Sequence, residues 1–597
     1  MQGADHANDM NGATEVGVYE TYEEFHGRKS TLDELVADIA KFDRQSMLWV
    51  CGVIITGMQL WDRLDRQPPD VFLTLIRLYF DKPFHRRLLI GFWSKVPRRV
   101  LFHRRQMLLI AKLAIKHCAD GRVNAMNNAQ MMGDILLKAN DQLAHGLLED
   151  LPKTESLPST KDELSRFVAE MLAMDDDGSV DVGQMLTRCH LMQRRFVQEL
   201  QGHSDWIDLA GEYEQVTGLT LEEYEAMALG VHSRFGFDLS KALYRDAGTL
   251  PLKDANFSAT AIPLEKVRWF LDSVSAGPVA MAKELASKDY GANDATIFRK
   301  YPMVLQYYNM WLTTAWCGFL MMDNGFLLEK VMTGPYWNAV AKYGQRLHRF
   351  WGEVFESYVH ELMKQATAGT SSAYLADPRS VIDNQRQLCD GVLRRNDCLV
   401  LMEYKGAVFR ADTKYSGNHV ALTAEIEKKL VHDHQSGNKK GVEQLAEAVK
   451  TLLGADGPKH FPHVSIDGIK RIYLYIVTLD SVGGTIGLCT LLNVFLDDLL
   501  DREAYPPIKI MPVYCSEVSA LEGIAPMLGK HSLAKILEHW YQTNGELFLP
   551  LRALSLPREE WGEKDWRALA WDEIWTNAIK ILFPNEAPKA RPKRSRP

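Results

Sequence analysis

An acidic residue and a lysine stand two positions apart at the end of an apolar stretch, Cys398–Arg410 (CLVLMEYKGAVFR). Side chains alternate across a β-strand, so Glu403 and Lys405 would share one face with the two leucines that precede them. Burying an acid and a base in an apolar strand is costly unless the charges are paired, hydrated or bound to a metal ion. The pattern therefore indicates charged chemistry presented from the end of a rigid strand.

Asp390 supplies a second carboxylate. It lies in the preceding candidate strand, and Arg394–Asp397 (RRND) has the composition of a hairpin turn. Such a turn would place Asp390 beside Glu403. Two carboxylates at such a short distance repel each other unless a cation lies between them. Two carboxylates, a backbone carbonyl and water molecules suit Mg²⁺. Lys405 could then orient or help to deprotonate an attacking water, or stabilise negative charge on a phosphate.

The order of these residues resembles the signature of the PD-(D/E)XK nuclease superfamily, which has the restriction-endonuclease-like fold. Asp390, twelve further residues and then Glu403-Tyr404-Lys405 are similar to its central motif. Upstream, FWGEVFESYVHELM resembles the helix that precedes the core strands and contributes an acidic residue. Glu356 is the better match for that residue, and Glu353 is the alternative.

The segment after the E-x-K strand extends the resemblance. KKGVEQLAEAVKTL resembles the helix that follows this strand in many members, with Gln444 at the recurrent glutamine. Two positions depart from the pattern. Cys389 stands where the motif has proline, a departure that is common in so diverse a superfamily. Ala448 stands where some RecB-like members have tyrosine, so the chain departs from that subgroup.

The resemblance implies a role for each matched residue. Asp390 and Glu403 would hold Mg²⁺ or Mn²⁺ together with the backbone carbonyl of Tyr404. Glu356 would contribute to the metal shell directly or through water, and Lys405 would assist the nucleophilic water. The implied reaction is hydrolysis of a phosphodiester bond.

Strands and helices alternate after Gly344, which predicts an α/β domain with a sheet covered by helices. After a helix at 345–366, strands are expected at 387–395, 398–406, 471–479 and 508–516, and helices at 441–453, 485–500 and 523–542. Before Gly344, apolar residues recur at helical spacing. The expected fold is multidomain, with a mostly α-helical N-terminal region followed by an α/β restriction-endonuclease-like C-terminal domain.

Turn signals and composition suggest a division into five parts. They are a flexible N-terminal segment (1–30), a helical domain with a basic stretch (31–150), a second helical region (151–344), the nuclease-like domain (345–550), and a helical extension with a basic, disordered tail (551–597). The best linker candidate is 151–163, which contains two prolines. A capping arrangement is expected where Ser30 precedes Asp33 and Glu34.

The chain's 597 residues, with 46% apolar residues and a net charge of −8, are typical of a soluble multidomain protein. The apolar run at 46–61 is shorter than the ~20 residues of a membrane span and predicts a buried helix. The polar N-terminus does not resemble a signal peptide, and no C-x-x-C occurs. We therefore expect a cytoplasmic protein without membrane contact. No nucleotide-hydrolysis motif is present, so any motor would be a separate protein.

The segment 82–116 carries ten Lys or Arg residues and no acidic residue. Its arginine pairs, among them Arg98-Arg99 and Arg104-Arg105, alternate with aromatic residues, a pattern that suits phosphates and bases. The alternative is a helix face that pairs with acidic neighbours. Gln444 is a further candidate for contact with substrate. Lys414 could meet a phosphate, but an exposed lysine is the more common case.

These observations predict a Mg²⁺-dependent nuclease that cuts DNA in preference to RNA, with a helical region that senses or regulates. The layout resembles bacterial restriction or anti-phage nucleases. The alternative is a non-catalytic nucleic-acid-binding or scaffold protein with a nuclease-like fold. The sequence leaves open whether the protein acts with a partner protein or as a homo-oligomer.

Overall fold

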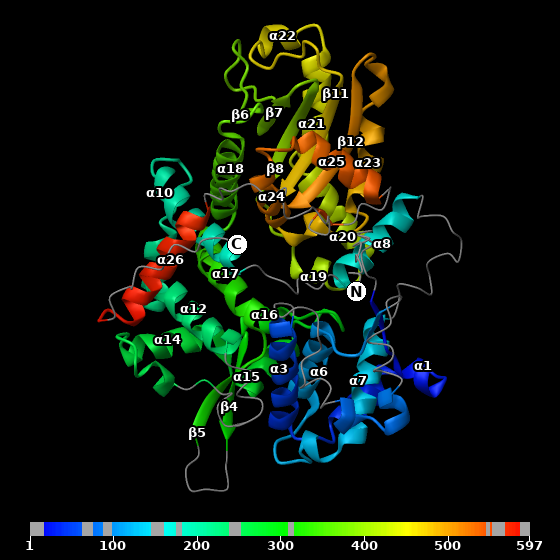
Figure 1. Ribbon diagram of the computed structural model, residues 1–597, viewed down its shortest axis with the longest axis vertical. Helices are drawn as coiled ribbons and strands as arrows, with labels where there is room; N and C mark the ends of the chain where they lie inside the picture. Colours follow the sequence, from blue (N-terminus) through cyan, green and yellow to red (C-terminus); the bar gives the residue numbers. More distant parts are fainter. Residues whose placement is uncertain are drawn as a thin grey trace, which may run out of the picture.

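The computed structural model describes residues 17–61, 76–86, 98–144, 160–174, 182–237, 252, 254–308, 316–544, 550–551 and 567–585. A mostly helical N-terminal part occupies the lower half of Figure 1, and an α/β C-terminal part occupies the upper half. This arrangement confirms the coarse prediction of a helical region followed by an α/β domain.

The N-terminal part begins with helices joined by a small parallel sheet of β1 and β2. Its elements are β1 (Gly17–Tyr19), α1 (Tyr22–His26), α2 (Leu32–Ile39), α3 (Arg44–Trp61), β2 (Arg98–Val100), α6 (Arg104–His117), η1 (Ala125–Asn127) and α7 (Ala129–Ala144). Residues 17–30 were expected to be flexible, but β1 and α1 lie within them. The predicted cap is displaced by one residue, because Thr31 and Glu34 form the capping box of α2.

The middle of the chain is helical except for one three-stranded sheet, which the sequence did not predict. Its elements are α8 (Lys161–Met174), α9 (Val182–His190), η2 (Leu191–Phe196), α10 (Val197–Glu199), α11 (Leu209–Thr217), α12 (Leu221–Phe237), η4 (Asp254–Phe257), α14 (Leu264–Val274), β3 (Ser275–Ala276), α15 (Pro278–Leu285), α16 (Thr296–Lys300), β4 (Met303–Tyr308), β5 (Trp316–Met321) and α17 (Asn324–Tyr343).

The C-terminal part follows the predicted alternation closely. Its elements are α18 (Gln345–Thr367), β6 (Ala373–Ala376), β7 (Gly391–Arg395), β8 (Cys398–Lys405), α19 (Ala411–Lys414), α20 (His419–Ile426), η5 (Glu427–Val431), β9 (His432–Asp433), β10 (Asn438–Lys439), α21 (Gly441–Leu453), α22 (Gly457–His460), β11 (Arg471–Thr478), η6 (Ser481–Gly484), α23 (Leu488–Leu499), η7 (Arg502–Ala504), β12 (Lys509–Glu517), α24 (Val518–Ile524), η8 (Ala525–Met527), α25 (Leu533–Asn544) and α26 (Arg567–Leu582).

The main sheet has five strands in the order β12-β11-β8-β7-β6. β8, β11 and β12 run parallel, whereas β6, β7 and β8 pair antiparallel. β7 and β8 form the predicted hairpin, with Arg395 opposite Cys398 and Asn396 in the turn at φ 54°. Asparagine tolerates this left-handed conformation, which explains its place in the tight turn. The strand that carries Glu403 is thus the centre of the sheet.

Helices α18 and α21 cover opposite faces of β8. On one face Lys405 contacts Gln444 of α21, and on the other the ring of Tyr404 packs edge-on against His360 of α18. Successive residues of a strand point to opposite faces, so the two helices must lie on either side of the sheet. Both helices carry residues that the sequence selected as candidates.

The apolar cores do not follow the predicted domain boundaries. Helix α8 belongs in sequence to the second helical region, yet Leu164 and Val168 are buried in the core of the C-terminal part. Figure 1 shows α8 beside α20 in the upper half of the molecule. Helix α26 returns to the helical part, where Ile574 joins a core formed by residues of α12, α14 and α17.

The apolar run at 46–61 lies in α3, where Met47, Leu48 and Ile54 have no exposed surface. This confirms the prediction of a buried helix. Across the part of the chain that the structure describes, no helix has the length and apolar character required to cross a membrane. The start of the predicted linker (151–159) and the predicted basic tail (from 588) lie outside the described residues.

Candidate active site at the end of β8

Asp390, Glu403 and Lys405 meet at the end of the central strand, as predicted. Asp390 Oδ2 accepts a hydrogen bond from the backbone N–H of Tyr404 at 2.6 Å, which ties the residue before β7 to β8. Lys405 Nζ lies 2.6 Å from Glu403 Oε2 and 3.8 Å from Asp390 Oδ2. Glu403 is 1% exposed and Asp390 5%. One ammonium group thus faces two buried carboxylates.

Gln444 joins this group from the first turn of α21. Its side-chain carbonyl accepts a hydrogen bond from Lys405 Nζ at 2.9 Å. Gly441 begins the helix close to its neighbours: a Cβ there would lie 2.5 Å from the carbonyl oxygen of Leu430. A side chain at position 441 would therefore push this end of α21 away from the sheet, and with it Gln444.

Glu356 approaches from α18. Burial of its carboxyl group and the nearby carboxylate of Asp390 raise the pKa of Glu356 to about 9. Glu353, the alternative, is exposed one turn earlier on the same helix. The structure therefore favours Glu356 as the acidic residue of this helix, because its partly buried carboxylate lies within electrostatic reach of both Asp390 and Glu403.

Carboxyl groups outnumber ammonium groups at this site. Burial and the carboxylate of Asp390 raise the pKa of Glu403 to about 8, although the ammonium group of Lys405 opposes the shift. Burial alone would lower the pKa of Lys405, but the carboxylates of Glu403 and Asp390 outweigh it and raise this pKa. With all groups ionised, one lysine would face three carboxylates. A further cation would relieve their mutual repulsion.

The donor set fits a hard divalent cation in part. No three His, Cys, Asp or Glu side chains among the described residues lie close enough together to form a complete metal site. Mg²⁺, however, is usually bound through one or two carboxylates and keeps several water molecules. Asp390 and Glu403 could supply these two ligands, and Tyr404, whose carbonyl is the third predicted ligand, directly follows Glu403 in the sequence.

Small and aromatic residues shape the far face of the site. The hydroxyl of Tyr374 lies 2.9 Å from that of Tyr404 and 2.7 Å from Nδ1 of His360. Gly391 leaves room for these phenols, since a Cβ there would lie 2.5 Å from the Tyr404 hydroxyl. The network holds β6, β8 and α18 together behind the charged residues.

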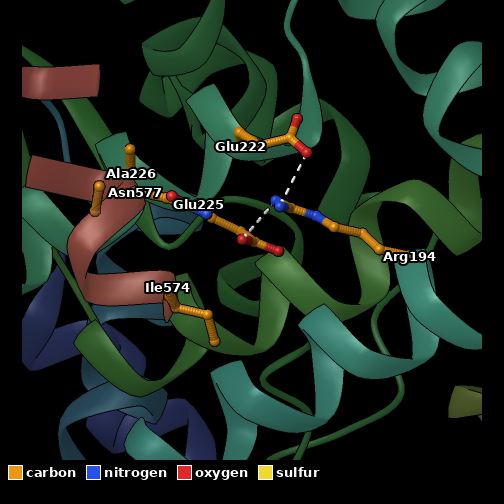
Figure 2. A pocket seen from close by; sticks show the side chains of 7 residues that line it. Arg194, Glu222, Glu225, Ala226, Ile574 and Asn577 are labelled. Atoms are coloured by element: carbon orange, nitrogen blue, oxygen red, sulfur yellow. Dashed lines mark hydrogen bonds and ion pairs between the residues drawn. The ribbon is translucent and has the colours of Figure 1, made fainter. Parts of the chain in front are cut away.

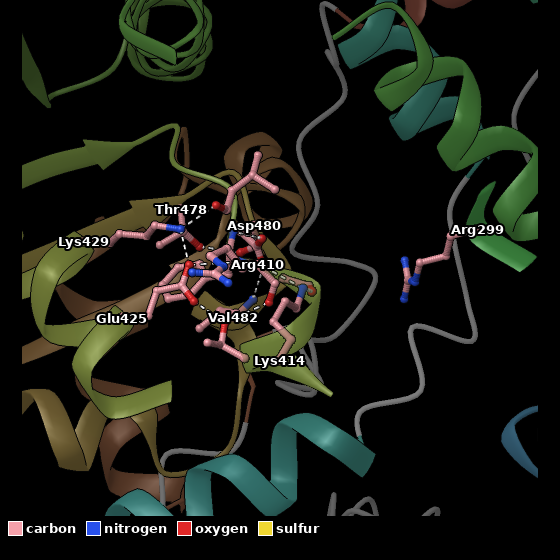
Figure 3. Close-up of polar contacts among 12 residues, drawn as sticks. Arg299, Arg410, Lys414, Glu425, Lys429, Thr478, Asp480 and Val482 are labelled. Carbon is pink, nitrogen blue, oxygen red and sulfur yellow. Dashed lines mark hydrogen bonds and ion pairs between the residues drawn. The ribbon is translucent and has the colours of Figure 1, made fainter. Parts of the chain in front are cut away.

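The chain beyond β8 is fixed by a polar cluster, shown in Figure 3. Asp480 accepts hydrogen bonds from the backbone N–H of Phe409 at 2.8 Å and from Lys414 Nζ at 2.9 Å. Glu425 accepts the N–H of Arg410 at 3.0 Å and also contacts Lys429. Lys414 is therefore buried in an internal ion pair, and it is neither the exposed lysine nor the phosphate contact that the sequence suggested.

The structure describes the side chains of one of the candidate arginine pairs in the basic stretch. Arg104 and Arg105 are only 7% and 8% exposed. Arg104 forms a two-bonded ion pair with Asp323, and Arg105 contacts Asn293. Both side chains are buried and bonded within the protein, so neither is available to a phosphate. Arg104 has the acidic partner of the alternative interpretation, although not on a solvated helix face. Arg98 and Arg99 lie in β2, but their side chains are outside the described part of the structure.

A second polar site lies between α12 and α26 in the helical part (Figure 2). Arg194 bridges Glu222 at 2.9 Å and Glu225 at 2.7 Å beside a pocket with an empty volume of about 190 Å³. Its charges are already paired within the protein, which makes it a poor candidate for a substrate site.

Two polar residues at the end of β8 escaped the sequence analysis. Gln387 donates a hydrogen bond from Nε2 to Asp390 Oδ1 at 3.1 Å and so orients that carboxylate. Lys440 directly precedes α21, and its ammonium group interacts electrostatically with Lys405 and Glu403. The position of Gln387 three residues before Asp390 gave no recognisable signal. Lys440 is the N-cap residue of α21, where a lysine side chain gives no capping signal in the sequence.

No family model matches this chain, and comparisons with curated proteins and with solved structures found no significant similarity.

Proposed function

We propose that this protein is a metal-dependent nuclease that hydrolyses phosphodiester bonds, with DNA as the preferred substrate over RNA. The observation that carries the proposal is the gathering of Asp390, Glu403, Lys405 and Gln444 at the end of β8. These residues come from three separate elements and match the order of the PD-(D/E)XK motif. The mixed five-stranded sheet between α18 and α21 is compatible with a restriction-endonuclease-like fold.

The residues divide the chemistry among them. Asp390 and Glu403 would hold Mg²⁺ or Mn²⁺, with Glu356 contributing directly or through water. A bound divalent ion supplies charge stabilisation at the phosphate and makes water more acidic. Lys405 would orient the attacking water or stabilise negative charge on the phosphate. Gln444 holds Lys405 in place from α21, and Gln387 holds Asp390.

The regulatory role of the helical part belongs to the same proposal. Helix α8 packs against α20 and α23, and His419 lies 3.4 Å from Asp162. A helix from the N-terminal half of the chain thus packs within the C-terminal part, beside the segment that follows β8. We propose that the helical part regulates the nuclease or detects the signal that activates it, as in a bacterial restriction or anti-phage effector.

The test is cleavage of supercoiled DNA, linear DNA and RNA with Mg²⁺ by the wild type and by Lys405→Ala and Glu403→Ala. Loss of one electrostatic catalytic group reduces rates by roughly 10²–10³-fold, and we expect losses of this size. Cleavage that survives both substitutions would show that another site or a contaminant cuts the substrate.

A second candidate is a non-catalytic nucleic-acid-binding protein with the same fold. The ion pair between Lys405 and Glu403 favours it, because Lys405 already neutralises one of the two carboxylates. Binding of DNA without cleavage of any substrate, with Mg²⁺ or Mn²⁺ present, would support this candidate over the nuclease.

A further inference from the structure

Lys440 occupies a defined place beside the proposed active site. It is the N-cap residue of α21, one helical turn before Gln444, and Gln444 N donates to its carbonyl oxygen. As the cap residue, Lys440 has an extended backbone, and its N–H donates to the carbonyl oxygen of Val431 at 3.1 Å. Its ammonium group lies within electrostatic reach of Lys405 and Glu403, which places it beside the end of β8.

The charge of Lys440 is not used within the described structure. Its side chain is half-buried, and its ammonium group forms no hydrogen bond or ion pair with any described residue. Burial and the ammonium group of Lys405 lower the pKa of Lys440, and Asp433 and Glu403 oppose this only in part. A lysine side chain also has no acceptor atom with which to cap a helix. The helix itself therefore gives no reason for lysine at this position.

Lys439 offers a direct contrast one residue earlier. It is exposed in β10, and its ammonium group lies 3.4 Å from Glu447 Oε2. Its charge is thus paired on the protein surface, away from Lys405. The two lysines are adjacent in the sequence, but their side chains have different surroundings in the structure.

We propose that Lys440 binds a backbone phosphate of the nucleic acid next to the bond that is cut. This inference rests on the proposed nuclease function and names one more residue of its substrate site. The substrate would bring the anion that the half-buried ammonium group lacks. Lys440 would fix the strand relative to Lys405 without taking part in proton transfer.

The experiment uses the full chain and whichever substrate the wild type cuts, supercoiled DNA or RNA. Lys440→Ala, Lys440→Arg and the matched control Lys439→Ala are compared in KM and kcat, and in binding of a fluorescein-labelled form of that substrate at several salt concentrations in EDTA. We expect Lys440→Ala to raise KM by roughly tenfold, the effect of losing one charged hydrogen bond, with a smaller change in kcat. Its salt slope should decrease by about one contact.

The control and the conservative variant separate binding from structure. Lys440→Arg should recover most of the affinity, and Lys439→Ala should match the wild type. If Lys440→Ala gives the same KM and salt slope as Lys439→Ala while the wild type cuts, the inference is wrong and the proposed function stands. If the wild type cuts neither DNA nor RNA, the proposed function fails and this inference fails with it.

Discussion

Two buried cations in this protein have opposite surroundings. In the helical part, Arg104 pairs with Asp323, with bonds of 2.5 and 2.9 Å and almost no exposed surface. At the end of β8, Lys405 faces Glu403 and Asp390, with Glu356 also within electrostatic reach. The first group pairs one cation with one carboxylate, and that carboxylate also caps α17. The second contains one cation and three carboxyl groups.

The difference separates a structural ion pair from a candidate site. A balanced buried pair satisfies its own charges, and removing one partner leaves the other uncompensated. A surplus of buried carboxylates lowers stability unless a further cation arrives. Burial and basic residues alone do not distinguish the two cases, but the local sum of charges does. Each of the following predictions tests this distinction.

The largest expected effect concerns cleavage. Asp390→Asn removes a charge from the surplus group and should reduce the cleavage rate by roughly 10²-fold or more. Arg104→Met should leave cleavage per folded molecule unchanged, because Arg104 lies in a separate core. Rates are measured with Mg²⁺, and the folded fraction of each variant is determined by circular dichroism. Equal losses in both variants would remove the distinction between the two groups.

The second prediction concerns the free energy of unfolding, for which we expect the larger effect at Arg104 and the smaller effect at the end of β8. Arg104→Met leaves Asp323 buried without its cation and should lower the free energy of unfolding by about 3–5 kcal/mol. Glu403→Gln removes one of several competing charges and should lower it far less, or raise it. Urea denaturation in metal-free buffer measures both changes. A larger loss for Glu403→Gln than for Arg104→Met would show that Lys405 belongs to a structural pair.

The third and smallest effect is a pH dependence of stability. The folded pKa values of Glu356 and Glu403, about 9 and about 8, lie above the ordinary value of 4.5. Between these values the folded protein binds more protons than the unfolded chain, so this contribution to stability is present below pH 4.5 and is lost as pH rises toward 9. Urea denaturation from pH 6 to 9 should show Glu356→Gln to be less sensitive to pH than the wild type. An identical slope in both proteins would contradict the shared-charge description.

The sequence predicted the site better than the elements around it. β8 and α21 were located to within one residue, because apolar alternation and helical spacing are local signals. The RRND turn fixed the register that brings Asp390 to Glu403. β6 was missed because its four residues form a partly exposed edge strand. The start of α8 was taken as linker, although Thr160 and Glu163 form a capping box.

The roles of the arginines could not be predicted from local sequence. Arg104 finds its partner 219 residues away, and nothing near it in the chain reveals Asp323. The same applies to Lys414, whose partner Asp480 follows β11. Lys440 is the reverse case. Its place directly before the helix could be predicted from the sequence, but its lack of an ion-pair partner depends on the fold. Charge pairing over long distances in sequence requires the fold.

Binding of Mn²⁺ tests the surplus of carboxylates most directly. Isothermal titration of the metal-free full chain is compared with Asp390→Asn, Glu403→Gln and the control Asp323→Asn, whose folded fraction is checked first. We predict saturable binding by the wild type and by folded Asp323→Asn, and binding at least about tenfold weaker in the two site variants. Equal affinity in all four proteins, or no binding by the wild type, would contradict a divalent-metal site at the end of β8.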